Sequence, residues 1–572
     1  MRETGVLVLT AFLAIALTAA DVHAVSGDAG QAATSDSSSE TQAHSADATA
    51  VTSPVRIEHH ASFRLRSDIL LGGDLGNTSS AIPVPFATDG EPSHTLAWTS
   101  IRLRYDAAVH VGEPWTIHVG LDALDNVVLG STFAGAGSSF EEGLWQDAQV
   151  SPVAGISGFS DALEVRHLYG TWRLLEFIDL SGGRMPDNRG LGMWRQAGLC
   201  PDCNYGTYVD GAQLGVDIFG FRIEVGWEAS AIGVTSEMPG MPGQPTNFDL
   251  SDDVNTWTLS LGHSALPVGI APSAPVDETK PGWAFDWSVH AALTSQSMDT
   301  AEQDLSDLGS ECAQLAGGTD ALLSLPYECW RLMPRDAALY RPGGWVQVVW
   351  RRSALSSLRL EFELSALIGE IENTQNDPAY QDSAKSLAGV GGAFELEYRD
   401  DRLQTGLDVG FATGDDGDYL GVSDGQNVSV ADELYLDDSS TAVRENETIS
   451  SFWFHRDYHI DLLLFRQVIG TVTNAVYVRP WVAYTLLDTE AVEIGARFDA
   501  LYAAAMNPEG TPGKGDHWGV EFDASAWVNL PHGFGMSLHT GVLLPLDALN
   551  DRVTGASPSP AFAARGLFYW RY

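Results

Sequence analysis

Four side chains that can ligate a metal or carry a proton recur at every second position of one short segment. They are His455, Asp457, His459 and Asp461. Side chains two residues apart share a face of a β-strand, so a strand here would bring all four together, and a His-x-Asp pair can bind a metal ion. The alternative is a polar strand face without a metal. Because no third ligand converges on the pair in the sequence, we assign no metal site.

Two further patterns could carry chemistry. Residues 421–425 read Gly-Val-Ser-Asp-Gly, but the hydrolase serine of a G-x-S-x-G motif needs a strand, a sharp turn and a helix, and this motif lies in an acidic segment. Asp415, Asp416 and Asp418 could bind Ca²⁺, but they lack the spacing and the closing Glu of a dedicated calcium loop. We therefore predict no catalytic residue and no cofactor, with Ca²⁺ on the acidic loops as the alternative.

The four cysteines fall into two close pairs, Cys200 with Cys203 and Cys312 with Cys329. Both pairs lie in turn-rich segments, and in an exported chain such pairs favour disulfides that staple loops. The alternatives are half of a zinc site and a redox motif. A four-thiolate zinc site would require both loops to meet, and a redox motif would require a thioredoxin-like βαβ pattern around it.

Apolar and charged residues alternate along the segments that must position these groups. Ile101, Leu103 and Tyr105 alternate with Arg102 and Arg104, and the same pattern recurs around residues 115–122, 221–228, 358–364, 394–399, 492–499 and 518–524. A period of two is what a sheet between two unlike solvents requires. A soluble β-sandwich also alternates, but its strands are typically about 5 to 6 residues long, whereas these segments approach the length that crosses a bilayer.

Aromatic residues recur near the ends of these segments, as in an interfacial girdle. They include Trp115, Tyr398, Trp453, Trp481, Trp518 and Trp570. Residues 56–572 are therefore predicted to form an all-β fold, a transmembrane antiparallel β-barrel of roughly 16 to 18 strands with long acidic outer loops. The longest loops are expected at 125–160, 232–252, 296–343 and 413–448.

The first 55 residues differ from the rest of the chain. Residues 1–24 contain an apolar run from Val6 to Ala20 and small-residue cleavage sites, which is typical of a signal peptide, with an uncleaved anchor helix as the alternative. Residues 25–55 are rich in Ser, Thr, Ala and Asp and are predicted to be a disordered periplasmic leader. The net charge of −45 excludes nucleic acid as a partner and favours cations.

The last segment ends in alternating aromatic residues, Phe568, Trp570 and Tyr572. It resembles the terminal strand by which outer-membrane barrels are recognised by their assembly machinery. The expected location is the bacterial outer membrane, the expected partners are its lipid and that machinery, and the oligomeric state is left open.

Several blocks resemble an uncharacterised family of predicted outer-membrane β-barrels from myxobacteria and related deltaproteobacteria. These blocks are residues 182–194, 200–211, 410–418, 457–480 and 507–523. The resemblance implies a barrel and brings no substrate and no catalytic residue. More loosely, the architecture is similar to porins and to polysaccharide-exporting barrels.

Charged residues on the predicted inner face divide into two walls. Pairing of the first and last strands would gather a basic wall, Arg64, Arg66, Arg102, Arg104, Arg565 and Arg571, and an acidic wall, Glu361, Glu363, Glu395 and Glu397, would lie across the lumen. We predict a passive, cation-preferring, porin-like channel for small polar solutes or an exported polymer, and no enzyme. The alternatives are a plugged structural or adhesion barrel and an outer-membrane hydrolase.

Overall fold

The computed structural model describes residues 55–76, 95–128, 163–230, 254–263, 281–301, 331–373, 384–415 and 448–572, except residues 74, 113, 176, 552 and 553. The chain divides into two compact units, Met1–Pro54 and Val55–Tyr572, and the second contains every described residue. The predicted signal peptide and leader lie outside the described residues, except that Val55 already belongs to the first strand.

The second unit is an all-β barrel whose antiparallel sheet closes on itself. Its first nine strands are β1 (Val55–Leu71), β2 (Thr95–Val111), β3 (Trp115–Val128), β4 (Leu163–Leu174), β5 (Ile178–Pro186), β6 (Tyr208–Ile218), β7 (Phe221–Ser230), β8 (Val254–Gly262) and β9 (Gly282–Ala301). The others are β10 (Arg331–Ser353), β11 (Ser356–Ile371), β12 (Lys385–Asp400), β13 (Leu403–Ala412), β15 (Ala475–Asp488), β16 (Glu493–Ala505), β17 (His517–Asn529), β18 (Phe534–Pro545) and β19 (Ala561–Arg571). These 18 strands confirm the predicted barrel and its predicted size.

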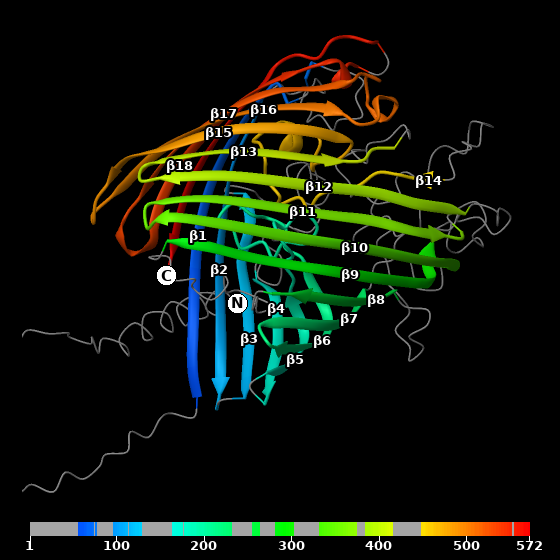
Figure 1. Cartoon of the computed structure of the whole chain (residues 1–572). Coiled ribbons are helices and arrows are strands. Elements are labelled where there is room, and N and C mark those ends of the chain that lie inside the picture. Colours follow the sequence, from blue (N-terminus) through cyan, green and yellow to red (C-terminus); the bar gives the residue numbers. More distant parts are fainter. Residues whose placement is uncertain are drawn as a thin grey trace, which may run out of the picture. The chain divides into compact units, whose positions relative to one another are not determined.

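Each strand pairs with its neighbours in sequence order, and the sheet closes where β1 pairs with both β2 and β19. At this seam Phe63 lies opposite Leu103 on one side and Trp570 on the other, and Figure 1 shows the blue first strands running beside the red last ones. The two-residue strand β14 (Thr448–Ile449) is not one of the 18 antiparallel strands of the wall. It pairs in parallel with one end of β12. Closure leaves the barrel without a free edge.

The two faces of the wall have opposite character. Along β1, Ile69 and Leu71 are exposed on the outer face, while the preceding even-numbered residues Arg66 and Asp68 are buried on the inner face. The outer face of β15 likewise exposes Val476, with Tyr477 buried beside it. An apolar exterior and a charged interior are what strand alternation predicted.

The two ends of the barrel differ in the length of their connections. Seven of the eight connections at the end where β1 starts and β19 stops are short, at residues 112–114, 175–177, 219–220, 354–355, 401–402, 489–492 and 530–533; the eighth, 263–281, is longer. Longer connections, such as 187–207 and 413–474, lie at the opposite end. Transmembrane barrels have this asymmetry, with short periplasmic turns and longer outer loops.

Three features of the fold correct the sequence predictions. The loop expected at 296–343 is shorter, because residues 296–301 belong to β9 and residues 331–343 to β10. Trp481 and Trp518 are buried on the inner face instead of lying in an aromatic girdle. For Trp518 the reason is a β-bulge, since Ala503 pairs with Gly519 and Ala504 with His517, which turns Trp518 inward.

Helical structure is short in the part of the chain that the structure describes. A π-helix spans Leu464–Val468, and 3₁₀ turns span Pro508–Gly510, Pro531–Gly533 and Asp547–Leu549. Among the described residues no helix is both long enough and apolar enough to cross a membrane.

Candidate functional site

Two connections from the long-loop end fold against the inner face of the wall. We call residues 187–207 the β5–β6 loop and residues 448–474 the β13–β15 segment. Their contacts with inward-facing strand residues, described below, place both inside the barrel, and they also bind each other. Inward-folded loops of this kind set the width of a barrel's lumen, so this region is the candidate functional site.

The arginines of the predicted basic wall bind carbonyl oxygens of the β5–β6 loop. Arg64 Nη1 and Arg102 Nη1 donate to the carbonyl of Cys203 at 3.1 and 2.6 Å. Arg104 Nη1 donates to the carbonyl of Gly198 at 2.6 Å. These arginines are buried, so the wall holds a loop instead of lining open water. Arg571 lies apart from them, exposed at the end of β19 with its guanidinium over the Tyr569 ring.

Asp202, at the tip of the β5–β6 loop, joins three arginines from different parts of the chain. Its carboxylate lies 2.7 Å from Arg466 Nη2, 2.9 Å from Arg565 Nη1 and 3.4 Å from Arg66 Nη1. Burial alone would raise the pKa of Asp202, but the arginines, Arg466 foremost, hold it well below its usual value. The carboxylate is therefore ionised and ties the loop to β1, β19 and the β13–β15 segment.

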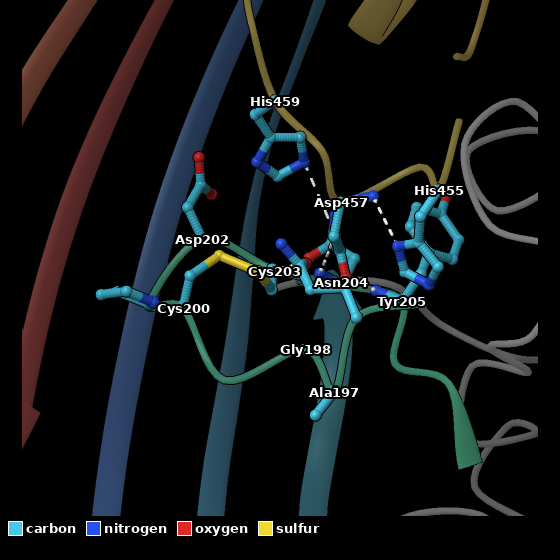
Figure 2. Close-up of a disulfide and its surroundings, with 12 residues drawn as sticks. Ala197, Gly198, Cys200, Asp202, Cys203, Asn204, Tyr205, His455, Asp457 and His459 are labelled. Atoms are coloured by element: carbon cyan, nitrogen blue, oxygen red, sulfur yellow. Dashed lines mark hydrogen bonds and ion pairs between the residues drawn. A yellow bond between two sulfur atoms is a disulfide. The ribbon is translucent and has the colours of Figure 1, made fainter. Parts of the chain in front are cut away.

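A disulfide joins Cys200 and Cys203, whose Cα atoms are 5.0 Å apart. The amide of Cys203 also donates to the carbonyl of Cys200 at 3.2 Å, which closes a tight turn. Figure 2 shows this turn with Asp202 beside it and with Asn204 and Tyr205 leading toward Asp457. The other predicted pair, Cys312 and Cys329, lies outside the described residues.

The loop's own arginines bind carboxylates of β7. Arg189 Nη1 lies 3.0 Å from Glu224 Oε1, and Arg195 forms a bidentate pair with Glu228 at 2.8 and 2.9 Å. Asp187, which follows β5, accepts from Arg195 at 2.6 Å. The β5–β6 loop is thus bound by charge on both sides, and bidentate pairs fix its orientation.

The predicted acidic wall binds N–H and O–H donors of both inward connections. Fully buried Glu363 accepts the amide N–H of Met193 at 3.3 Å, and Glu395 accepts the hydroxyl of Tyr458 at 3.0 Å. Glu361 and Glu397 instead accept from Arg359 of the same wall. The topology places β11 and β12 about half-way around the sheet from β1.

The four residues considered as a metal site do not lie on a strand, which corrects that prediction. They belong to the irregular part of the β13–β15 segment. Asp457 accepts the amides of Asn204 and Tyr205 at 2.9 and 2.7 Å, while His459 Nε2 lies 3.5 Å from its carboxylate (Figure 2). Among the described residues no three metal-ligating side chains converge. Asp457 therefore joins the two inward connections.

Burial shifts the pKa values of the ionisable groups where the two inward connections meet. It raises the pKa of Asp457 to about 7, against the lowering effect of the two amides. It lowers the pKa of His455 to about 4 and lowers that of His459. The histidines are therefore neutral near pH 7, and His455 Nδ1 accepts the amide of Asp457 at 3.1 Å.

Glu521 is a residue whose role the sequence did not indicate. It is completely buried on β17 and accepts the amides of Leu462, Leu463 and Leu464 at 2.9, 2.7 and 2.8 Å. Asp461 accepts the next amide, that of Phe465, at 2.6 Å. Two carboxylates thus satisfy the orphan N–H groups at the start of the π-helix.

The β13–β15 segment also forms an apolar core inside the barrel. Its buried side chains pack with inward-facing apolar residues on strands from β10 around to β1. The members from the segment are Ile449, Phe452, Phe454, Tyr458, Ile460, Leu462, Leu463, Leu464, Phe465, Val468, Ile469 and Val472. The unbroken apolar run Leu462–Phe465, which does not alternate, was the available signal.

The remaining candidate residues are those of the G-x-S-x-G motif and of the possible Ca²⁺ site. The G-x-S-x-G motif, Asp416 and Asp418 lie outside the described residues. Asp415 accepts the amide and hydroxyl of Ser450 at 2.6 and 3.0 Å, a structural use of its carboxylate.

The aromatic residues of the predicted assembly signal lie on β19 or directly after it. Phe568 lies against Phe63 and Phe534, and Trp570 Nε1 donates to the carbonyl of His532 at 3.1 Å. Tyr572 exchanges backbone hydrogen bonds with Ala61 and is 56% exposed. The last strand is therefore fixed in register with the first.

The barrel of this chain is similar to those of several solved structures. No family model matches the sequence, and no curated protein matches it. The barrel is similar to a BenF-like porin from Pseudomonas fluorescens Pf-5, with a TM-score of 0.43 and 9% identity over 90% of this chain and 98% of that chain. It is also similar to Pseudomonas aeruginosa OccK9 (OpdG), with a TM-score of 0.43 and 11% identity over the same shares. Pseudomonas aeruginosa OpdK, solved with vanillate, has a TM-score of 0.41 and 9% identity, again over 90% and 98%.

Proposed function

We propose that this chain is a passive, porin-like channel of the bacterial outer membrane that carries small polar solutes and prefers cations. The observation that supports a membrane location is the opposition of the two faces, because a closed sheet with an apolar exterior and a charged interior suits lipid outside and water inside. The two inward connections then form the constriction, and a narrowed lumen favours small solutes over a polymer.

Two observations bear on the proposed cation preference: the accessible charges of the two walls and the net charge of the chain. On the basic wall the side chains of Arg66 and Arg102 are 3% and 4% exposed, because the β5–β6 loop covers them. On the acidic wall Glu395 and Glu397 keep 25% and 18% of their side-chain surface. Arg359 and Arg399 on the same wall are 37% and 51% exposed, so the accessible charge of this wall is mixed. The cation preference therefore rests mainly on the net charge of −45, which attracts cations to the chain as a whole.

Membrane integration is the first test. Full-length protein should fractionate with outer membranes and migrate differently on a gel after boiling, because the closed barrel resists detergent until it is heated. Recovery as a soluble periplasmic monomer would contradict the proposal.

Selectivity is tested by reversal potentials in planar bilayers under a salt gradient. Wild type should prefer cations, and the double variant Glu395→Gln with Glu397→Gln should lose part of that preference. Glu370→Gln is the matched control, because Glu370 is an exposed residue of β11 that faces outward and should leave selectivity unchanged. Anion preference of the wild type would contradict the proposal, as would equal effects of the double variant and the control.

A plugged structural barrel is the second candidate. The β13–β15 segment forms an apolar core inside the barrel wall, and this observation favours the second candidate. An apolar core would block the passage of polar solutes. Heat-modifiable, membrane-inserted protein that gives no conductance would support this candidate over the channel. Neither candidate assigns catalysis to a side chain.

A further inference from the structure

A shallow apolar groove lies on the outer face of the barrel, across strands β9 to β12. Its volume is about 510 Å³, and its lining includes Trp287, Val289, Pro342, Gly344 and Leu364. Val289 and Leu364 are exposed residues of the outer face, so the groove opens to whatever surrounds the barrel and not to the lumen. Its position separates it from both inward connections.

The groove exists because β10 carries Pro342-Gly343-Gly344 in the middle of a long strand. Pairing between β10 and β11 passes from Tyr340–Ile368 to Gly343–Ser365, as expected where Pro342 has no N–H to donate. The two glycines differ. A Cβ on Gly343 would lie 2.2 Å from His290 Nε2, so packing inside the barrel demands that glycine.

Packing inside the wall does not demand Gly344. A Cβ there would meet its nearest atoms at 3.5 and 3.6 Å, which is ordinary contact. Gly344 lies between Val289 and Leu364 in the sheet register, and its missing side chain is what opens the floor of the groove. The absent side chain therefore leaves apolar space open on the outer face of the barrel.

The surroundings of the groove indicate the chemistry of an occupant. Toward the short-turn end, Trp283 and Trp350 are paired across β9 and β10 with ring centroids 6.0 Å apart, and exposed Arg352 follows at the end of β10. Arg352 lies six positions after Val346, which is roughly 20 Å along a strand. Paired tryptophans and a cation at that distance from an apolar groove match an interfacial headgroup region and a lipid chain.

We propose that this groove is a binding site for one anionic glycerophospholipid, with an acyl chain against Gly344 and the phosphate near Arg352. The inference rests on the membrane location of the proposed function. It places the headgroup at the short-turn end of the barrel, because the tryptophan pair and the arginine lie there. The site is a second functional surface, independent of conduction.

The test uses full-length protein in detergent, titrated with 1-palmitoyl-2-oleoyl-phosphatidylglycerol and followed by native mass spectrometry. Wild type should retain one lipid at least ten times more tightly than any further lipid. Gly344→Leu, which fills the groove, should abolish that preference, and Arg352→Gln should weaken it about five-fold. Ala500→Leu adds the same side chain to the outer face of β16, and Arg402→Gln removes an exposed arginine from another short turn, so both should bind as wild type does.

Equal retention by all variants would overturn the inference, and so would a change of oligomeric mass in Gly344→Leu, which would assign the groove to a second copy of the chain. If Gly344→Leu does not fold, Gly344→Ala fits without a clash and should show an intermediate loss of two- to three-fold. A barrel that inserts and conducts but shows no groove-dependent retention defeats this inference alone. Failure to insert defeats the proposed function.

Discussion

The two inward connections occupy the same barrel but are held by different forces. The β5–β6 loop contributes little to the apolar core and is held by guanidinium groups on its carbonyls and by ion pairs at Asp202, Arg189 and Arg195. The β13–β15 segment contributes twelve members of that core, and carboxylates bind its N–H groups. One connection is fixed by charge and the other packs as a small hydrophobic domain.

The charge of each part of the inner wall determines whether it binds backbone carbonyl oxygens or backbone N–H groups. Arginines on β1 and β2 take carbonyl oxygens, whereas Glu363 on β11 and Glu521 on β17 take amide N–H groups. A buried wall charge therefore does not need a mobile counterion, because the polar backbone of an irregular segment satisfies it. Charges on a barrel's inner face can position loops as well as select solutes.

Of the changes proposed here, removing the Asp202 carboxylate should destabilise the β5–β6 loop most. Asp202→Asn removes the carboxylate that Arg66, Arg466 and Arg565 share, leaving Asp68 as the partner of the two strand arginines, and should cost about 3 kcal/mol in the free energy of local opening of residues 187–207, measured by amide hydrogen exchange. Asp210→Asn is the control, because the Arg184–Asp210 pair is more than half exposed and should contribute less than about 1 kcal/mol. Equal exchange in the two variants would show that the loop is not held by charge.

Shortening a core side chain should loosen the other connection by a comparable amount. Leu463 is completely buried, and Leu463→Ala should cost about 2–4 kcal/mol, with faster exchange confined to residues 449–472. Leu355→Ala, in a short turn where the side chain is 61% exposed, should change exchange by less than about 0.5 kcal/mol. Loss of protection in both connections would mean that they open as one unit.

The wall was predictable from sequence and the connections were not. Alternation is local, so residues such as Ile101 and Arg102 reveal their faces without knowledge of their partners. The role of Asp202 depends on Arg565, which lies 363 residues away, and no local pattern announces that pairing. The strand predicted at His455 failed because two alternating pairs are too short a signal beside the unalternating run Leu462–Phe465.

The contact between the two inward connections at Asp457 should make the stability of the protein depend on pH. The folded pKa of about 7 exceeds the unfolded value of about 3.9, so the folded state binds more protons between them and this carboxyl makes the protein less stable as pH rises from about 4 to about 7. The lowered pKa of His455 acts in the opposite sense below about 6.5. Asp457→Asn removes the first contribution and keeps the second.

The measurement is the free energy of unfolding of wild type and Asp457→Asn at several pH values. The wild-type free energy should fall relative to that of the variant between pH 4 and 7, by about 3–4 kcal/mol, and the two profiles should run parallel above pH 8. Parallel profiles throughout would show that Asp457 is not a buried acid in solution.

The disulfide should have the smallest effect. Replacing Cys200 and Cys203 together by Ser opens a very short covalent loop, which should cost at most about 2 kcal/mol, and Arg64 and Arg102 still hold the carbonyl of residue 203. Hydrogen exchange of residues 187–207 should therefore change less than in Asp202→Asn. A larger change would make the covalent bond, and not the charge, the main constraint on this loop.

The central claim is that the barrel conducts and that the two inward connections set the width of its passage. Single-channel conductance tests it most directly, by comparing wild type with a variant in which residues 451–472 are replaced by a short Gly/Ser linker. We expect a reproducible, cation-preferring conductance for wild type and a several-fold larger one for the variant, both from heat-modifiable protein. Equal conductances would contradict it, because the β13–β15 segment would then not bound the passage.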